Sequence, residues 1–337
     1  AMREYEQEIL ERYALGVKGT RRIRGAFFCD TDEGAMLLKE TNISEKRAFS
    51  LYRTESWLES LGMLVDTPVF TKEGDILSVS RDGTKYIMKK WYCGRECDLK
   101  KESELVRAAR NLAVLHMKMN LAAQDQEYGE IYTGIPVRRN PLEEIKSHNR
   151  ELKKVRSFVR NRVAKNEFEY LFLHSFEKMY RMAETVADHL ENSGCMELYE
   201  QSVSRECLAH GDYNYHNILI LPGGTGVTNF EHMCIDIQVH DLYYFIRKAM
   251  EKFQWKENIG KIILDAYESE RKLEETEKLY IGLFLAYPEK FWKTAGSYYH
   301  SNKAWLPEKN VEKLETAVNQ WKEKYGFLKR VFLLDLQ

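Results

Sequence analysis

The segment from His210 to Ile220, HGDYNYHNILI, constrains this chain most strongly. It sets a histidine, an aspartate and an asparagine at fixed spacing and then runs into an apolar stretch typical of a buried strand. Phosphoryl transfer needs a carboxylate that orients the acceptor hydroxyl and oxygen ligands that hold Mg²⁺. Asp212 fits the first role as a catalytic base, Asn217 fits the second as a metal ligand, and His210 would brace the loop by hydrogen bonds. A surface turn rich in polar residues is the alternative interpretation of this match.

The second polar segment is TNFE, in which Asn229 lies twelve positions after Asn217. Together the two segments resemble those of the aminoglycoside phosphotransferase and choline kinase branch of the protein-kinase-like fold. In that branch the second motif reads Ile-Asp-Phe-x, its aspartate binds the metal, and a later aspartate begins a helix. The resemblance therefore puts Asn229 in the metal position and makes Asp241 the later aspartate. Asp236 is a rival for the metal position, but it lies too close to Asp241 and too far from Asn217.

The first hundred residues alternate short apolar runs with turn signals, whereas most of the chain beyond them is helical in pattern. DEG and RDG indicate hairpin turns, and SEKRAFSLYRTESWLESLG predicts a helix with Ser44 at its N-cap and Gly62 at its end. Other predicted elements are helices over 3–15, 101–120, in 141–192 and in 241–330, and a β-rich island over 205–236.

We therefore expect an α+β, bilobal protein-kinase-like fold with a small antiparallel sheet and a larger, mostly helical lobe. The N-terminal lobe is predicted to span residues 1–90 and the hinge residues 91–98. The helical C-terminal lobe is predicted to span residues 99–337 and to carry the catalytic segment over 208–241.

A kinase-like first lobe implies a lysine that contacts nucleotide phosphates and pairs with a glutamate on the following helix. Lys39, in AMLLKE, takes that place near the end of a predicted strand. Glu55 lies near the centre of the predicted helix, and we expect it to be the partner in preference to Glu45 or Glu59. The alternative for Lys39 is a solvated position at a strand end.

Two further parts of a nucleotide site are weaker predictions. The turn that covers the phosphates should lie within GVKGTRRIRG, where Gly19 would allow a tight turn, although this is not a full Gly-x-Gly-x-x-Gly loop. YIMKKWY would form the adenine side of the site, with Met88 and Lys90 among the residues that offer backbone hydrogen bonds and apolar contact. A plain strand between the lobes has the same sequence pattern.

The missing carboxylate at position 229 has a chemical consequence. Asn229 is nearly isosteric with aspartate and still offers one oxygen, but it lacks the negative charge that hard cations favour in their ligands. Weaker metal binding and much slower chemistry are expected. Glu231 would face the same side of a strand as Asn229, so it is a candidate substitute metal ligand.

TNFE, DLYYFIRKAMEKFQW and AYPEKFWKTAGSYYHSNKAWLPE together look like the CotS family of spore coat proteins, a resemblance that covers nearly the whole chain. It implies synthesis in the mother-cell cytoplasm of a sporulating bacterium and deposition in the spore coat beside other coat proteins. Three functions compete. They are a structural coat component with lost or impaired activity, an ATP- and Mg²⁺-dependent kinase acting on a small hydroxyl-bearing molecule or sugar, and a nucleotide-binding switch without transfer.

Composition excludes some other classes of function. A net charge of −1 argues against general nucleic-acid or anionic-membrane binding. The polar, acidic first residues do not resemble a secretory signal, and no apolar run is long enough to predict a membrane span. Six scattered cysteines are typical of reduced thiols. The basic stretch over 137–165 is interpreted as a solvated face, with the rim of a substrate or partner groove as the alternative.

Overall fold

The computed structural model describes residues 4–122, 134–301 and 308–336. The chain divides into two compact units, and each is described by itself. The first unit groups residues 1–137, 205–241 and 266–271, and the second groups residues 138–204, 242–265 and 272–337. The segment 205–241, which carries the expected catalytic residues, groups with residues 1–137 and not with the helices that follow it in sequence. The lobe boundaries expected around 91–98 stay a prediction.

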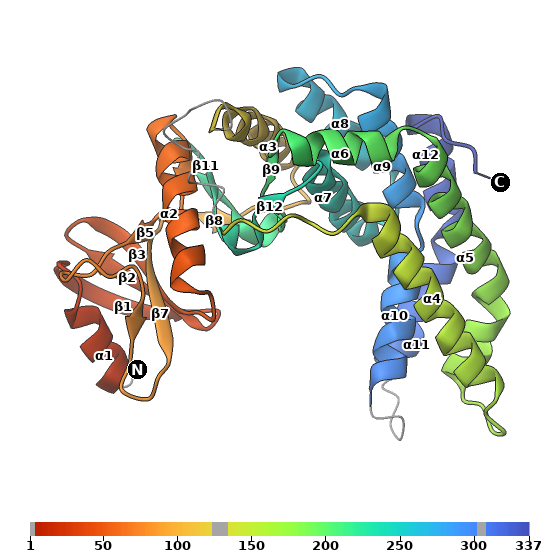
Figure 1. Cartoon of the computed structure of the whole chain (residues 1–337), viewed down its shortest axis with the longest axis horizontal. Helices are drawn as coiled ribbons and strands as arrows, with labels where there is room; N and C mark the ends of the chain where they lie inside the picture. The colour runs from red at the N-terminus through yellow and green to blue at the C-terminus, as the bar shows by residue number, and fades with distance from the viewer. Residues whose placement is uncertain (1–3, 123–133, 302–307, 337) are drawn as a thin grey trace. The chain divides into compact units, whose positions relative to one another are not determined.

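An antiparallel sheet forms the first part of the first unit (Figure 1). Its strands, in spatial order, are β1 (Val17–Ile23), β2 (Ala26–Thr31), β3 (Gly34–Glu40), β7 (Lys85–Lys90) and β5 (Pro68–Val69), with β6 (Ser78–Val79) also paired to β7. The predicted turns at DEG and RDG are confirmed. Gly34 and Gly83 have φ of 103° and 86° there, values that glycine adopts without the steric penalty of a Cβ.

The turn between β1 and β2 lies within the predicted stretch but not at the predicted residue. Gly19 is inside β1, next to a shift in register. The chain reverses at Arg24 and Gly25, which have φ of 42° and 80°, as the two central residues of a tight hairpin require. The prediction of a turn at Gly19 was therefore wrong, because pairing of the whole of β1 with β2 outweighs the flexibility of one glycine.

The two faces of the sheet pack against different helices (Figure 1). Alternate residues such as Leu38 and Met88 point toward α1 (Glu4–Glu11) and form a buried cluster with Ile9 and Leu10. Ile87, on the other face, packs with α2 (Glu45–Ser60). The predicted caps of α2 are confirmed: Ser44 Oγ accepts from Arg47 N at 3.1 Å, and Gly62 follows the helix with φ of 86°.

The predicted β-rich island over 205–236 is also confirmed. Its strands are β9 (Leu208–Ala209), β10 (Ile218–Leu221), β11 (Gly224–Val227) and β12 (Cys234–Ile235). β10 and β11 form a hairpin, extended on one side by β4 (Leu64–Val65) and on the other by β8 (Arg95–Glu96), while β9 pairs with β12. This hairpin brings together the ends of the two polar segments, since Thr228 N donates to Asn217 O at 2.9 Å.

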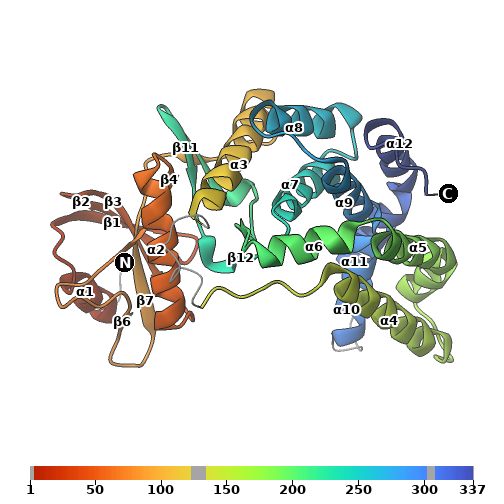
Figure 2. The ribbon, with the colours of Figure 1, turned by 45° about the horizontal axis from the view of Figure 1, so that its top comes forward.

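Helices make up most of the remaining described chain, as predicted. They are α3 (Glu102–Ala122), α4 (Pro141–Arg160), α5 (Glu167–Asn192), α6 (Cys195–Ser204), α7 (Val239–Lys252), α8 (Glu257–Glu270), α9 (Glu275–Ala286), α10 (Glu289–His300), α11 (Glu308–Asn319) and α12 (Trp321–Val331). In the second unit α4 and α5 lie side by side, with α10 against α4 and α11 against α5 (Figure 2). Asn166 caps α5 with a capping box that also uses Glu169.

Candidate functional site

The buried ring of His210 supports the loop over residues 210–217 by hydrogen bonds. The ring is fully buried, with Nε2 at 2.9 Å from Thr228 O, and Nδ1 accepts from Asp212 N at 3.1 Å. These partners require a proton on Nε2 and a lone pair on Nδ1, which is the neutral ring. Burial lowers the pKa of His210 and favours the same form. His210 therefore braces the loop, as predicted, and is too deeply buried to touch a substrate.

Asp241, near the start of α7, fixes the backbone of the same loop. Its carboxylate accepts from His210 N at 2.8 Å, from Gly211 N at 2.9 Å and from His116 Nε2 at 2.9 Å. Burial would raise the pKa of Asp241, but the hydrogen bond and charge of His116 lower it below its ordinary value. The sequence indicated Asp241 but gave no signal for His116, a single histidine on an otherwise ordinary amphipathic helix.

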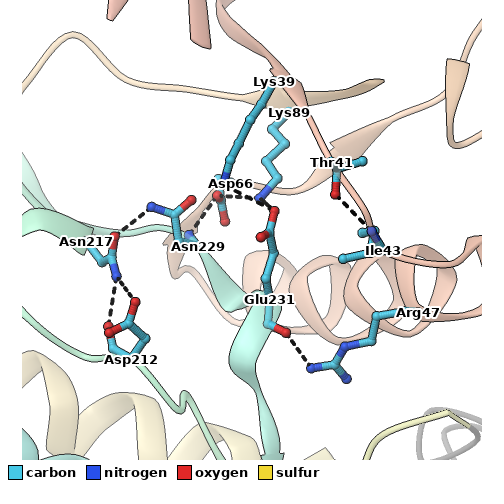
Figure 3. Close-up of polar contacts among 10 residues, drawn as sticks. All are labelled: Lys39, Thr41, Ile43, Arg47, Asp66, Lys89, Asp212, Asn217, Asn229 and Glu231. Carbon is cyan, nitrogen blue, oxygen red and sulfur yellow. Dashed lines mark hydrogen bonds and ion pairs between the residues drawn. The ribbon is translucent and has the colours of Figure 1, made fainter. Parts of the chain in front are cut away.

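Asp212, Asn217 and Asn229 form a hydrogen-bonded row (Figure 3). Asn217 Nδ2 donates to Asp212 O at 2.8 Å and to Asp212 Oδ2 at 3.1 Å. Asn229 Nδ2 donates to Asn217 Oδ1 at 2.6 Å. The geometry thus places Asn229 opposite Asn217. Asp236 instead directly follows β12, and its N donates to the carbonyl oxygen of Cys207, just before β9, at 2.9 Å.

The backbone at Asn229 is held by a residue that the sequence analysis missed. Asn229 has φ of 59°, in the left-handed region that asparagine tolerates better than most residues. Its N–H donates to Asp66 Oδ2 at 2.9 Å, and Asp66 is fully buried in the loop between β4 and β5. Asp66 is one polar residue in a short apolar run, so nothing in the local pattern marks it.

The predicted ion pair between Lys39 and Glu55 does not occur. Lys39 Nζ lies 3.4 Å from Glu231 Oε1 (Figure 3). A second lysine, Lys89, is fully buried and lies 3.2 Å from Asp66 Oδ2 and 3.7 Å from Glu231 Oε1. The cause is the strand register, which pairs Leu37 with Lys89 and so puts Lys89 on the face of the sheet that also carries Lys39.

Glu55 lies within this buried group without joining an ion pair of its own. Burial, and then the neighbouring Asp66 carboxylate, raise the pKa of Glu55 well above its ordinary value, which favours its neutral form. Burial alone would lower the pKa of Lys89, but the adjacent carboxylates, Asp66 first among them, raise it. The charged pair at the base of the site is therefore Lys89 with Asp66.

Arg47 on α2 provides another connection that the sequence did not indicate. Its guanidinium donates to Glu231 O at 3.0 Å and also to Met233 O. Because these acceptors are backbone carbonyls, Arg47 holds the backbone after Asn229 in place. This contact does not depend on the conformation of the Glu231 side chain.

Met88 and Lys90 do not present their side chains to this group. Met88 packs in the apolar cluster on the α1 side of the sheet, and Lys90 pairs with Glu59. The backbone N–H of Lys90 donates to Thr67 O and that of Trp91 donates to Ala35 O, each at 2.9 Å. Contact of these residues with an adenine ring stays a prediction, and it would have to avoid those two occupied donors.

The donor set fits a divalent metal poorly. In the part of the chain that the structure describes, no group of three or more His, Cys, Asp or Glu side chains is arranged to hold a metal ion. Asn217 Oδ1 already accepts from Asn229, and the Glu231 carboxylate is shared by two lysines. Asp212 offers a carboxylate beside the Asn217 amide, and the nearby Asp66 carboxylate already accepts from Lys89 and from Asn229 N, so few charged oxygens remain for a hard cation.

Comparison with solved structures identifies the class of fold. An aminoglycoside phosphotransferase from Alicyclobacillus acidocaldarius superposes with a TM-score of 0.85 at 15% identity, over 98% of this chain and 96% of that one. Amicoumacin kinase, solved with AMP-PNP and Ca²⁺, gives 0.61 at 13% identity over 97% and 94% of the two chains. Spectinomycin phosphotransferase, solved with AMP, gives 0.62 at 11% identity over 95% and 98%. The fold is the α+β fold of aminoglycoside-phosphotransferase-like kinases.

The family follows from the sequence itself. Residues 6–331 match the family described as "Spore coat putative kinase YutH", and the chain belongs to it. It is also similar to spore coat protein S of Bacillus subtilis (strain 168), with 21% identity over 340 residues that cover 96% of this chain and 93% of that protein. The expected resemblance to the CotS family is thereby confirmed. Within the described residues, no helix is both long and apolar enough to span a membrane.

Replacing Gly211 by alanine should destabilise the loop. Gly211 has φ of 85°, and a Cβ there would lie 2.1 Å from the backbone oxygen of His232. We expect Gly211→Ala to lower the free energy of unfolding by about 2 kcal/mol, measured by urea denaturation. Gly223→Ala is the matched control, since a Cβ at that position meets nothing within 4 Å. Equal stability of the two variants would contradict the described packing.

Two adjacent lysines allow a test of the buried pair. Lys89→Met leaves Asp66 buried and unpaired, so we expect a loss of about 3–5 kcal/mol in the free energy of unfolding. Lys90→Met removes a half-exposed pair with Glu59 and should cost less than about 1 kcal/mol. The double variant Lys89→Met/Asp66→Asn should recover part of the loss, and a double variant no more stable than Lys89→Met would show that the two side chains are not coupled.

Proposed function

We propose that this protein is a structural component of the spore coat whose kinase-like site has impaired or lost phosphotransferase activity. It would be made in the mother-cell cytoplasm and assembled with other spore coat proteins. Membership of the spore coat family supports the location, and the described site supports the loss of activity.

The observation that carries this proposal is the hydrogen bond of 2.6 Å from Asn229 Nδ2 to Asn217 Oδ1. A metal bound by both residues would need both side-chain oxygens directed at it. Here the amide NH₂ of Asn229 occupies the place opposite Asn217 Oδ1 that a cation would take. The loop therefore satisfies its own polar groups, and a metal would have to break that bond to enter.

Glu231 is a weak substitute for the missing carboxylate. It lies between Lys39 and Lys89, at 3.4 Å and 3.7 Å. Moving its carboxylate to a metal would leave a fully buried lysine with one anionic partner fewer, which is unfavourable because a buried charge depends on its partners. The position of Glu231 fits a role in holding the lysines and does not favour metal binding.

A second candidate is an active ATP- and Mg²⁺-dependent kinase acting on a small hydroxyl-bearing molecule. It is favoured by the intact loop around Asp212, which His210 and Asp241 hold in place. Lys39 also remains near the site, where it would contact nucleotide phosphates. A third function is a nucleotide-binding switch that transfers no phosphate. It would use the same residues to bind the nucleotide.

Calorimetry with ATP separates these candidates. We expect ATP binding by the natural protein to be absent or unaffected by Mg²⁺. In Asn229→Asp, the restored charge should make Mg²⁺ strengthen ATP binding roughly 10-fold or more. Asn161→Asp adds the same charge at an exposed position outside the site and serves as the control.

The opposite result is equally clear. If Mg²⁺ strengthens ATP binding by the natural protein as much as it does in Asn229→Asp, the amide does not impair the metal site. The proposal of lost activity would then be wrong, and a search for the acceptor hydroxyl should follow.

A further inference from the structure

A small cavity lies among the helices of the second unit. Its lining comes from α5, α7, α10, α11 and α12 and from the turns that follow α7 and α9. The space open to the centre of a water molecule is about 30 Å³, enough for one small molecule. The charged side chains in the lining are Arg247, Glu251, Glu289, Lys290 and Lys324.

The amine of Lys324, on α12, lies against a backbone carbonyl and an aromatic ring. Its Nζ donates to Tyr287 O at 2.9 Å and lies 5.2 Å from the ring centre of Trp255. Burial lowers the pKa of Lys324 to about 7, although the nearby Glu251 carboxylate opposes the shift. A large share of this amine is therefore neutral near pH 7, and a neutral amine has a lone pair that can attack an electrophile.

Arg247, on α7, brings an unused hydrogen-bond donor to the same cavity. Its side chain is only 6% exposed, and its Nε has no hydrogen-bond partner among the residues that the structure describes. The two carboxylates in the lining are paired with other groups, since Arg247 NH1 lies 3.2 Å from Glu251 Oε1 and Lys293 Nζ lies 3.5 Å from Glu289 Oε1. An anionic oxygen formed in the cavity would give Arg247 Nε the acceptor that it lacks.

The aromatic wall of the cavity is held by strained backbone. Gln254 and Trp255 have φ of 55° and 58°, in the left-handed region that large side chains rarely adopt. Strain of this kind persists only where the surrounding structure requires it, and it is common at ligand sites. Here it sets the buried indole of Trp255 beside the Lys324 amine, which keeps water away from that amine.

We propose that Lys324 is a site of reversible carbamylation by carbon dioxide. The lone pair of the neutral amine attacks the carbon of CO₂, so that an N–C bond forms, one C–O π bond breaks and its electron pair goes to oxygen. One amine proton passes to solvent water, and the product is an anionic carbamate. The carbamate nitrogen keeps one N–H for Tyr287 O, and its oxygens can accept from Arg247 Nε.

Carbon dioxide suits this cavity better than a larger electrophile does. It is small and uncharged, so it enters a space of about 30 Å³ without the cost of removing a hydration shell from a charge. The inference is independent of the proposed function, because every group in it belongs to the second unit and none belongs to the loop over 210–217.

Chemical trapping tests the proposal on the natural protein. The protein is equilibrated with isotope-labelled bicarbonate near neutral pH, any carbamate is made stable by O-ethylation, and the labelled residue is located by peptide mass spectrometry. We expect at least roughly 10-fold more label at Lys324 than at Lys322, which is exposed on the same helix and does not line the cavity. No label at Lys324, or equal label at the two lysines, would overturn the proposal.

A variant tests the part played by the guanidinium. Arg247→Lys keeps the positive charge but has no Nε donor, so labelling of Lys324 should fall roughly 5-fold or more. Arg150→Lys makes the same change at an exposed position on α4 and should leave the labelling as it is. Urea denaturation establishes that Arg247→Lys is folded, and a folded variant labelled as strongly as the natural protein would remove Arg247 from the site. If Arg247→Lys does not fold, the trapping result for the natural protein decides alone.

Discussion

The carboxylate of Asp66 is the point on which the site depends. One of its oxygens accepts from buried Lys89 and from the backbone of Asn229, so a single group joins β7, the loop before β5 and the left-handed turn. Such a buried charge is tolerable only while it is paired and hydrogen-bonded. The conformation of Asn229 is therefore coupled to the ion pair in the sheet, and the loop is ordered by the protein's own charges before any ligand arrives.

Features set by neighbours in sequence were predictable. The caps of α2, the turns at DEG and RDG, and the β-rich island depend on local conformational preferences and on hydrophobic periodicity. The correspondence of Asn217 with Asn229 was predictable for a related reason. A short hairpin connects them, so their spacing in sequence almost determines their spacing in the structure.

Features set by the pairing of distant strands were not predictable. Lys39 lies near the end of β3, and Lys89 and Lys90 lie at the end of β7. The register between those strands decides which of these three lysines is buried. The sequence correctly predicted that Glu55 lies on α2. Which lysine lies near Glu55, however, depends on the same register between β3 and β7. The contact of Arg24 with His216 joins residues 192 positions apart, and no local pattern records such a contact.

The left-handed backbone at Asn229 accepts asparagine and aspartate almost equally well, so steric fit does not distinguish an amide from a carboxylate there. The difference is electrostatic. A carboxylate would face Asn217 Oδ1 and lie beside Asp212 and Asp66, and would need a cation for the loop to close, whereas the amide closes it unaided. An amide at this one position thus gives a loop whose closure does not depend on the metal content of the surroundings.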